Sequence, residues 1–143
     1  MALLNQLNLV TQDMAKAVGF YARLGVDLRV TPDGKHAEGK LDNGMTLELD
    51  TRDFVPDWDV GWRGTTGGST VIGFALESRE AVDERYSTLT AAGGGGLRHQ
   101  PPYDAFWGAP YAIVDDPDGN PIGLMSPIEA ERKYWPPHAK RRA

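Results

Sequence analysis

The chain has 143 residues, with 15 Lys and Arg against 20 Asp and Glu, and it contains no cysteine. This length is typical of one compact domain with a real core, and the acidic balance argues against nucleic acid, whose phosphates require a basic surface. The absence of cysteine excludes disulfides, thiolate metal sites and a cysteine nucleophile. Because no stretch approaches the roughly 20 apolar residues of a membrane span and no basic signal region opens the sequence, we expect no membrane partner and a cytoplasmic location.

The first half of the sequence predicts a strand, a helix and then three short strands. Residues 7–10 are apolar enough for a strand, and Asp13 is typical of a helix N-cap because its carboxylate can accept from free N–H groups of the first turn. Apolar residues then recur at helical spacing until Gly25, which ends the helix. Residues 28–30 return to extended structure, and Asn43-Gly44 predicts the turn of a hairpin.

The second half repeats this order. Residues 71–76 predict a strand, Ser78 is an N-cap candidate, and the glycines at 93–96 stop the helix that follows. The most informative stretch is 111–125, in which two apolar segments flank the turn Asp116-Pro-Asp-Gly-Asn120. Proline presets φ, aspartate bonds its own backbone and glycine allows a positive φ, so this stretch predicts a tight hairpin.

Matching segments of the two halves are 65 residues apart at the first strands and 75 apart at the final hairpins. The growing offset indicates an insertion in the second half, near residues 93–96 and 100–103. We interpret the pattern as an internal duplication, the alternative being chance similarity between two generic α+β units. The predicted organisation is a single domain, 1–143, with modules at about 3–51 and 69–126 and a C-terminal helix and tail at 127–143.

Two segments resemble signatures of a known family. These are Asp13 to Gly25, with its Phe20-Tyr21 and Leu24-Gly25 pairs, and the hairpin at 111–125. They are similar to the glyoxalase/bleomycin resistance protein/extradiol dioxygenase superfamily, also called the vicinal oxygen chelate (VOC) superfamily. The resemblance covers about residues 5–126. It implies an α+β fold of two βαβββ modules whose curled mixed sheets surround a cup, often at a dimer interface, so we expect a homodimer.

The resemblance also implies where a metal would bind, because many members hold a divalent ion with four side chains. Transferred by position, the four places are Gln6, Glu48, Val71 and Gly123. Valine and glycine offer no ligand atom, and two remaining side chains would hold an ion weakly. The sequence therefore predicts no metal and no cofactor.

The three histidines do not change this expectation. His36 lies by the first hairpin, His99 follows the glycine run and His138 is in the tail, and none has the i, i+4 spacing of a helical metal pair. Glu48 alternates with leucines, so it lies on the polar face of its predicted strand. That face either meets water or points into the cup, where Glu48 would be a candidate base or a polar anchor.

Aromatic residues supply the remaining site candidates. The predicted ligand-binding set comprises Gln6, Glu48, Trp58, Trp62, Tyr103, Phe106, Trp107 and Tyr111. One loop tryptophan would be explained as a lid over the core, but this number of rings exceeds that need. Large rigid rings line small-molecule pockets and stack on planar ligands.

Two functions of different classes fit these residues. The first is metal-independent binding of a small molecule, such as an antibiotic or aromatic metabolite, as in the bleomycin-resistance branch, whose groove binds an aromatic, cationic drug. The alternative is an enzyme of the same superfamily, a lyase, isomerase or dioxygenase-like protein, that uses Glu48 as base or metal ligand. The sequence alone leaves both open.

Overall fold

The computed structural model describes residues 1, 3–67 and 70–135, and it shows the order strand, helix and three strands twice. The first module comprises β1 (Gln6–Thr11), α1 (Met14–Leu24), β2 (Arg29–Val30), β3 (His36–Lys40) and β4 (Thr46–Thr51). The second comprises β5 (Ile72–Ala75), α2 (Arg79–Thr90), β6 (Leu97–Asp104), β7 (Pro110–Asp115) and β8 (Pro121–Met125). Two 3₁₀ turns, η1 (Val55–Asp57) and η2 (Ala130–Arg132), follow the modules.

Each module folds into one four-stranded mixed sheet, and the two sheets have the same topology. The strand orders are β1-β4-β3-β2 and β5-β8-β7-β6, with the first and last strands of each module parallel and the other pairs antiparallel. The sheets are not closed into a barrel. The predicted α+β fold of two βαβββ modules is confirmed.

Local signals place both helices as the sequence predicts. The Asp13 carboxylate accepts from the backbone N–H of Lys16 at 3.1 Å, and Gly25 ends α1 with φ of 106°. Ser78 caps α2 by accepting from the N–H of Ala81 at 3.1 Å. These caps satisfy N–H groups that have no partner within the helix.

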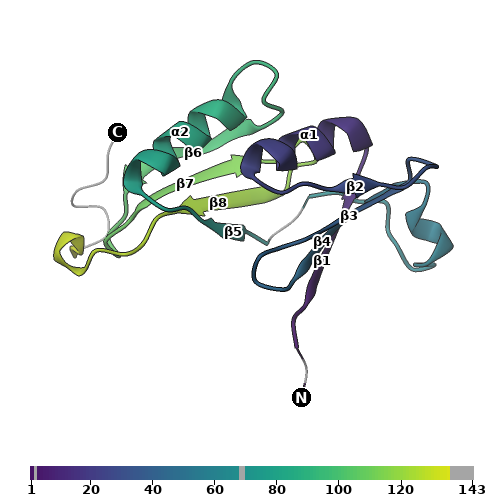
Figure 1. Ribbon diagram of the computed structural model, residues 1–143, viewed down its shortest axis with the longest axis horizontal. Coiled ribbons are helices and arrows are strands. Elements are labelled where there is room, and N and C mark those ends of the chain that lie inside the picture. Colours follow the sequence, from purple (N-terminus) through teal and green to yellow (C-terminus); the bar gives the residue numbers. More distant parts are fainter. Residues whose placement is uncertain (2, 68–69, 136–143) are drawn as a thin grey trace.

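Both helices lie on the same side of the sheets (Figure 1). The core fills the space between the helices and the sheets. There, apolar side chains from both modules form one cluster that includes Phe20, Leu47, Val82 and Leu124. Because neighbouring strand residues point to opposite faces, every second residue enters this core. The alternate residues lie on the opposite face, which neither helix covers.

The insertion expected in the second half appears in β6. This strand has eight residues where its counterpart β2 has two, and its pairing with β7 shifts register on both sides of Gln100. Pro101 and Pro102 lie in the second of these irregular stretches, on the outer strand of the sheet. Proline has no N–H to donate, so an irregular edge strand is where a sheet tolerates it.

The prediction of a C-terminal helix after residue 127 is wrong within the described residues: up to Trp135, only the three-residue turn η2 forms. The backbone N–H of Glu129 donates to the carbonyl of Gly108, and that of Tyr134 donates to the carbonyl of Phe106. These N–H groups bond to the loop before β7 rather than to a helix of their own. The tail expected beyond Trp135 lies outside the described residues.

A buried carboxylate joins the two modules. Asp116, which is 1% exposed, accepts from the Tyr21 hydroxyl at 2.6 Å and from the N–H groups of Asp118 and Asn120 and the amide of Asn120. Burial, the nearby carboxylate of Asp116 and the hydrogen bond to it raise the pKa of Tyr21, so the hydroxyl keeps its proton and donates. The turn of the last hairpin is therefore tied to α1.

Tyr21→Phe should lower the free energy of unfolding by about 1–2 kcal/mol, because it deletes one hydrogen bond to a buried charged group. Tyr86→Phe is the matched control, since the Tyr86 hydroxyl is buried in α2 and has no hydrogen-bond partner within the described residues. Its removal should leave stability unchanged or raise it. Urea denaturation of both variants and the wild type measures the difference, and equal effects would contradict the role given to Tyr21.

Candidate functional site

A hollow of about 280 Å³ lies on the uncovered face of the first sheet. Its lining comes from β1, β3, β4 and the connection around η1: Gln6, Asn8, His36, Glu48, Asp50, Phe54 and Trp58. Strand alternation explains this set, because Leu47 and Leu49 turn into the core and thereby direct Glu48 and Asp50 to the other face. Of the predicted site residues, Gln6, Glu48 and Trp58 meet here.

His36 lies at the centre of the polar part of this hollow. Its Nδ1 is 2.6 Å from Oδ1 of Asp50, whose side chain is 2% exposed. Its Nε2 is 3.7 Å from a carboxylate oxygen of Glu48 and 3.9 Å from one of Glu38. The Asp50 carboxylate can only accept a hydrogen bond, so it holds the proton on Nδ1 and turns Nε2 towards the two glutamates.

Negative charge dominates this cluster. Glu38 and Glu48 are direct cross-strand partners of the β3–β4 pair, and like charges at such positions repel. Burial raises the pKa of Glu48, His36 lowers it, and the charges of Glu38 and Asp50 raise it further. The cluster can therefore attract a cation or accept a proton.

Sequence reasoning missed His36 because it looked for histidines at helical spacing. The signal was present in the hairpin: pairing across the Asn43-Gly44 turn sets His36 opposite Asp50 and Glu38 opposite Glu48. Counting residues outward from that turn would have found the cluster. The structure thus places His36 beside Glu48, a contact that helical spacing could not indicate.

The second sheet carries an aromatic group on its uncovered face. Tyr103 and Tyr111 are direct partners of the β6–β7 pair, and Trp107 packs edge-on against Tyr111 with ring centroids 5.2 Å apart. Phe106 packs edge-on against Trp107 at 5.1 Å. Tyr103, Phe106, Trp107 and Tyr111, four of the predicted ligand-binding residues, thus form one wall, called the aromatic wall below.

The loop that presents this wall is held at both sides. The Trp107 indole N–H donates to the sulfur of Met125 at 3.1 Å, and the Tyr134 hydroxyl donates to the carbonyl of Asp104 at 2.5 Å. Gly108 takes φ of 97° against the backbone of Glu129, where a Cβ would clash. These contacts hold the rings in place before any ligand arrives.

The two tryptophans of the connecting segment differ in their surroundings. Trp58 borders the hollow of the first sheet and is 51% exposed. The Arg52 guanidinium lies 5.6 Å from the ring centroid of Trp62, and it also donates to the carbonyl of Gly64 at 2.8 Å. The Trp62 ring therefore packs against Arg52 within the connecting segment.

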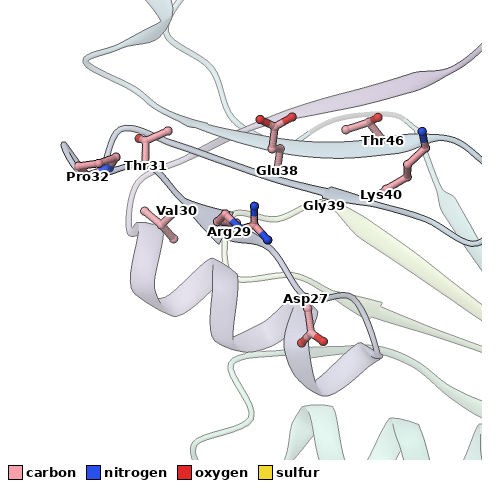
Figure 2. A pocket seen from close by; sticks show the side chains of 9 residues that line it. All are labelled: Asp27, Arg29, Val30, Thr31, Pro32, Glu38, Gly39, Lys40 and Thr46. Carbon is pink, nitrogen blue, oxygen red and sulfur yellow. The ribbon is translucent and has the colours of Figure 1, made fainter.

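A further groove of about 660 Å³ lies at the outer edge of the first sheet, by β2 and β3 (Figure 2). It is lined by Asp27, Arg29, Val30, Thr31, Pro32, Glu38, Gly39, Lys40 and Thr46. Glu38 and Thr46 point away from α1, whereas Asp27 lies on the side of the helix (Figure 2). Glu38 is thus common to this groove and the cluster around His36.

The comparisons with known proteins agree with the fold and with the order of the elements. A family model for the Glyoxalase/Bleomycin resistance protein/Dioxygenase superfamily matches residues 3–124. The chain belongs to this superfamily. No curated protein matches it.

No described helix is long and apolar enough to cross a membrane.

Several solved structures share the fold. A glyoxalase-related enzyme from Fulvimarina pelagi is 19% identical and superposes with a TM-score of 0.77, over 99% of this chain and 96% of that one. A hypothetical protein from S. aureus is 22% identical, with a TM-score of 0.74 over 89% and 95% of the two chains. A glyoxalase/bleomycin resistance protein/dioxygenase from Nocardioides is 25% identical, with a TM-score of 0.68 over 90% and 85%.

The four metal positions of the superfamily do not fit a metal in this chain. Gln6 and Glu48 lie on the first sheet, but Val71, before β5, and Gly123, on β8, have no ligand atom. A Cβ at Gly123 would lie 2.8 Å from the Tyr111 hydroxyl, so the tyrosine occupies the space that a side chain on β8 would need. Tyr111 of the aromatic wall thus fills the space at the Gly123 ligand position.

Gly123→Ala should lower the free energy of unfolding by about 1–3 kcal/mol, because its methyl group forces the Tyr111 ring to move. In a Tyr111→Ala background the same change should cost less, since the obstructing ring is gone. A double-mutant cycle measured by urea denaturation gives the coupling. Additive effects of the two substitutions would contradict the packing of Tyr111 over Gly123.

Proposed function

We propose that this protein binds a small, partly planar organic molecule in an aromatic-lined cup, in the manner of the bleomycin-resistance branch and independently of a metal. The observation that carries the proposal is the aromatic wall, in which Trp107 is held by both Tyr111 and Met125. Phe106, Trp107 and Tyr111 are only partly buried, so they keep surface free for a ligand, whereas Tyr103 is buried. Rigid rings of this kind bind planar molecules with little loss of side-chain entropy.

The charge of the protein suggests which planar molecules fit. The carboxylates of Glu38, Glu48 and Asp50 gather on the uncovered face of the first sheet, and the chain has a net charge of −5. Negative potential in a cleft concentrates cationic ligands. We therefore propose an aromatic, cationic antibiotic or metabolite as the ligand, and antibiotic resistance by sequestration, in the cytoplasm, as the biological role.

Trp107→Ala should weaken binding of such a ligand at least tenfold while leaving the fold intact, because it removes the central ring of the aromatic wall. Trp62→Ala removes the same side chain from the connecting segment, where the Arg52 guanidinium lies over the ring, so it compares the two predicted ligand-binding tryptophans. Calorimetric titration with aromatic, cationic antibiotics, with and without EDTA, measures both effects. Equal affinity of Trp107→Ala and wild type would refute the proposed site.

We further propose a homodimer. The uncovered faces of both sheets need a partner to close a cup. Large apolar side chains are also exposed just before β1 and β5: Leu3, Leu4 and Val71 are 83%, 72% and 47% exposed. A second copy related by a twofold axis is the common solution. Light scattering at micromolar concentration should give about twice the 15.6 kDa of the chain. A mass near 15.6 kDa would contradict the dimer.

The pairing of His36 with the buried Asp50 favours a second candidate, an enzyme of the superfamily. A carboxylate that orients an imidazole is a common device of general-base catalysis, and Glu48 lies on the other side of the ring. Glu48 would then act as base or as metal ligand. If Trp107→Ala binds as wild type does and Glu48→Gln abolishes a turnover, the enzyme displaces the binding protein.

A further inference from the structure

We propose that His36, Glu38 and Glu48 form a binding site for one divalent first-row transition-metal ion on the uncovered face of the first sheet. The site uses β3 and β4, and Glu48 is the only one of its ligands at a metal position of the superfamily. It departs from the expectation of no metal, which considered only the superfamily positions and judged the histidines by helical spacing. It also goes beyond the proposed function, since none of its ligands belongs to the aromatic wall.

The first support is geometric. One ligand atom from each of the three side chains can be chosen so that all lie within 4.8 Å of one another. The Nε2 atom of His36 is 3.7 Å from Glu48 and 3.9 Å from Glu38. A tetrahedral ion with bonds of about 2.1 Å sets its ligand atoms roughly 3.4 Å apart, so small side-chain movements suffice.

The second support is the orientation of the imidazole. Asp50 is 2% exposed and lies 2.6 Å from Nδ1, which leaves Nε2 with its lone pair directed at the glutamates. Histidine ligands of metals almost always donate their other N–H to a carboxylate, a backbone carbonyl or a water, which fixes the ring and raises its basicity. Asp50 is thus a positioning residue for the ion.

The third support is the unbalanced charge. Glu38 and Glu48 face each other across the β3–β4 pair, and within the described part of the chain neither forms an ion pair with a lysine or arginine. Direct opposition of like charges destabilises a sheet unless a cation lies between them. Glu48 is also only 15% exposed, so water screens its charge incompletely.

The ligand set indicates the class of ion. One imidazole and two carboxylates suit Zn²⁺, Co²⁺, Ni²⁺ or Mn²⁺, whereas Mg²⁺ and Ca²⁺ prefer oxygen ligands alone. Three protein ligands leave at least one coordination position free, as in catalytic rather than structural zinc sites. Two of the three ligands, His36 and Glu48, line the same hollow as Asn8 and Trp58, so a small molecule in that hollow would lie beside the ion.

The test is a calorimetric titration of the full chain, stripped with chelator and dialysed, with Zn²⁺ alone, followed by Co²⁺ with its visible absorption spectrum. We expect one ion per chain. His36→Gln should abolish saturable binding, and Glu38→Gln should weaken it at least tenfold. Asp50→Asn should weaken it about 10–100-fold, the usual effect of removing such a partner, and shift the Co²⁺ spectrum.

The chain contains a matched control in His99. Its Nδ1 lies 2.7 Å from Asp115 on the second sheet, so it repeats the histidine–aspartate pair without the two glutamates. His99→Gln should therefore bind Zn²⁺ as the wild type does. Circular dichroism of each variant establishes that it is folded, and Glu38→Gln alters a side chain that is 59% exposed, so it tests the site without disturbing the core.

Three results would overturn the proposal: no saturable Zn²⁺ or Co²⁺ binding by the wild type, unchanged affinity in Glu38→Gln, or an equal loss in His99→Gln and His36→Gln. The proposal that the protein binds a planar molecule is tested independently of the metal site. Planar-ligand affinity is measured with EDTA present and depends on Trp107, whereas ion binding is measured without organic ligand and depends on His36.

Discussion

The packing of α1 and α2 on one side of both sheets is the constraint on which the rest of the structure depends (Figure 1). It gives the chain a single core, and it obliges every strand to place alternate residues away from that core. The strand residues that alternate with the leucines, valines and alanines of the core therefore form the uncovered face. Each polar or aromatic residue of the candidate sites occupies such an alternate position or a loop beside it.

The two modules use this shared arrangement for different chemistry. On the first sheet the uncovered face is acidic and centred on His36, which Asp50 holds from the buried side. On the second sheet the same face is aromatic and centred on Trp107 and Tyr111. If the modules arose by duplication, their sheet topology has stayed the same, while their uncovered faces have diverged.

Packing accounts for the loss of one of the superfamily's metal positions, the one at Gly123. Tyr111 crosses the space above Gly123, and a side chain long enough to reach a metal could not coexist with that ring. The carboxylate at Glu48 remains, and its neighbours across the hairpin are an acid and a histidine rather than ligands from the second module. The pairing of β3 with β4 therefore supports a metal site on these two strands, displaced from the superfamily positions by one strand.

The sequence by itself determined the elements whose signals are local. Asp13, Gly25 and Ser78 cap the helices, Asn43-Gly44 turns the first hairpin, and period-two alternation assigns Glu48 to the polar face. Only the tertiary structure decided which of these residues meet, because contacts between strands depend on register, on bulges such as those of β6, and on where loops return. For that reason the aromatic wall could be predicted as a set of residues but not as a packed group. For the same reason the sequence did not identify His36. It also did not predict η2, which forms in place of the expected helix because the backbone on either side of it bonds to the loop before β7.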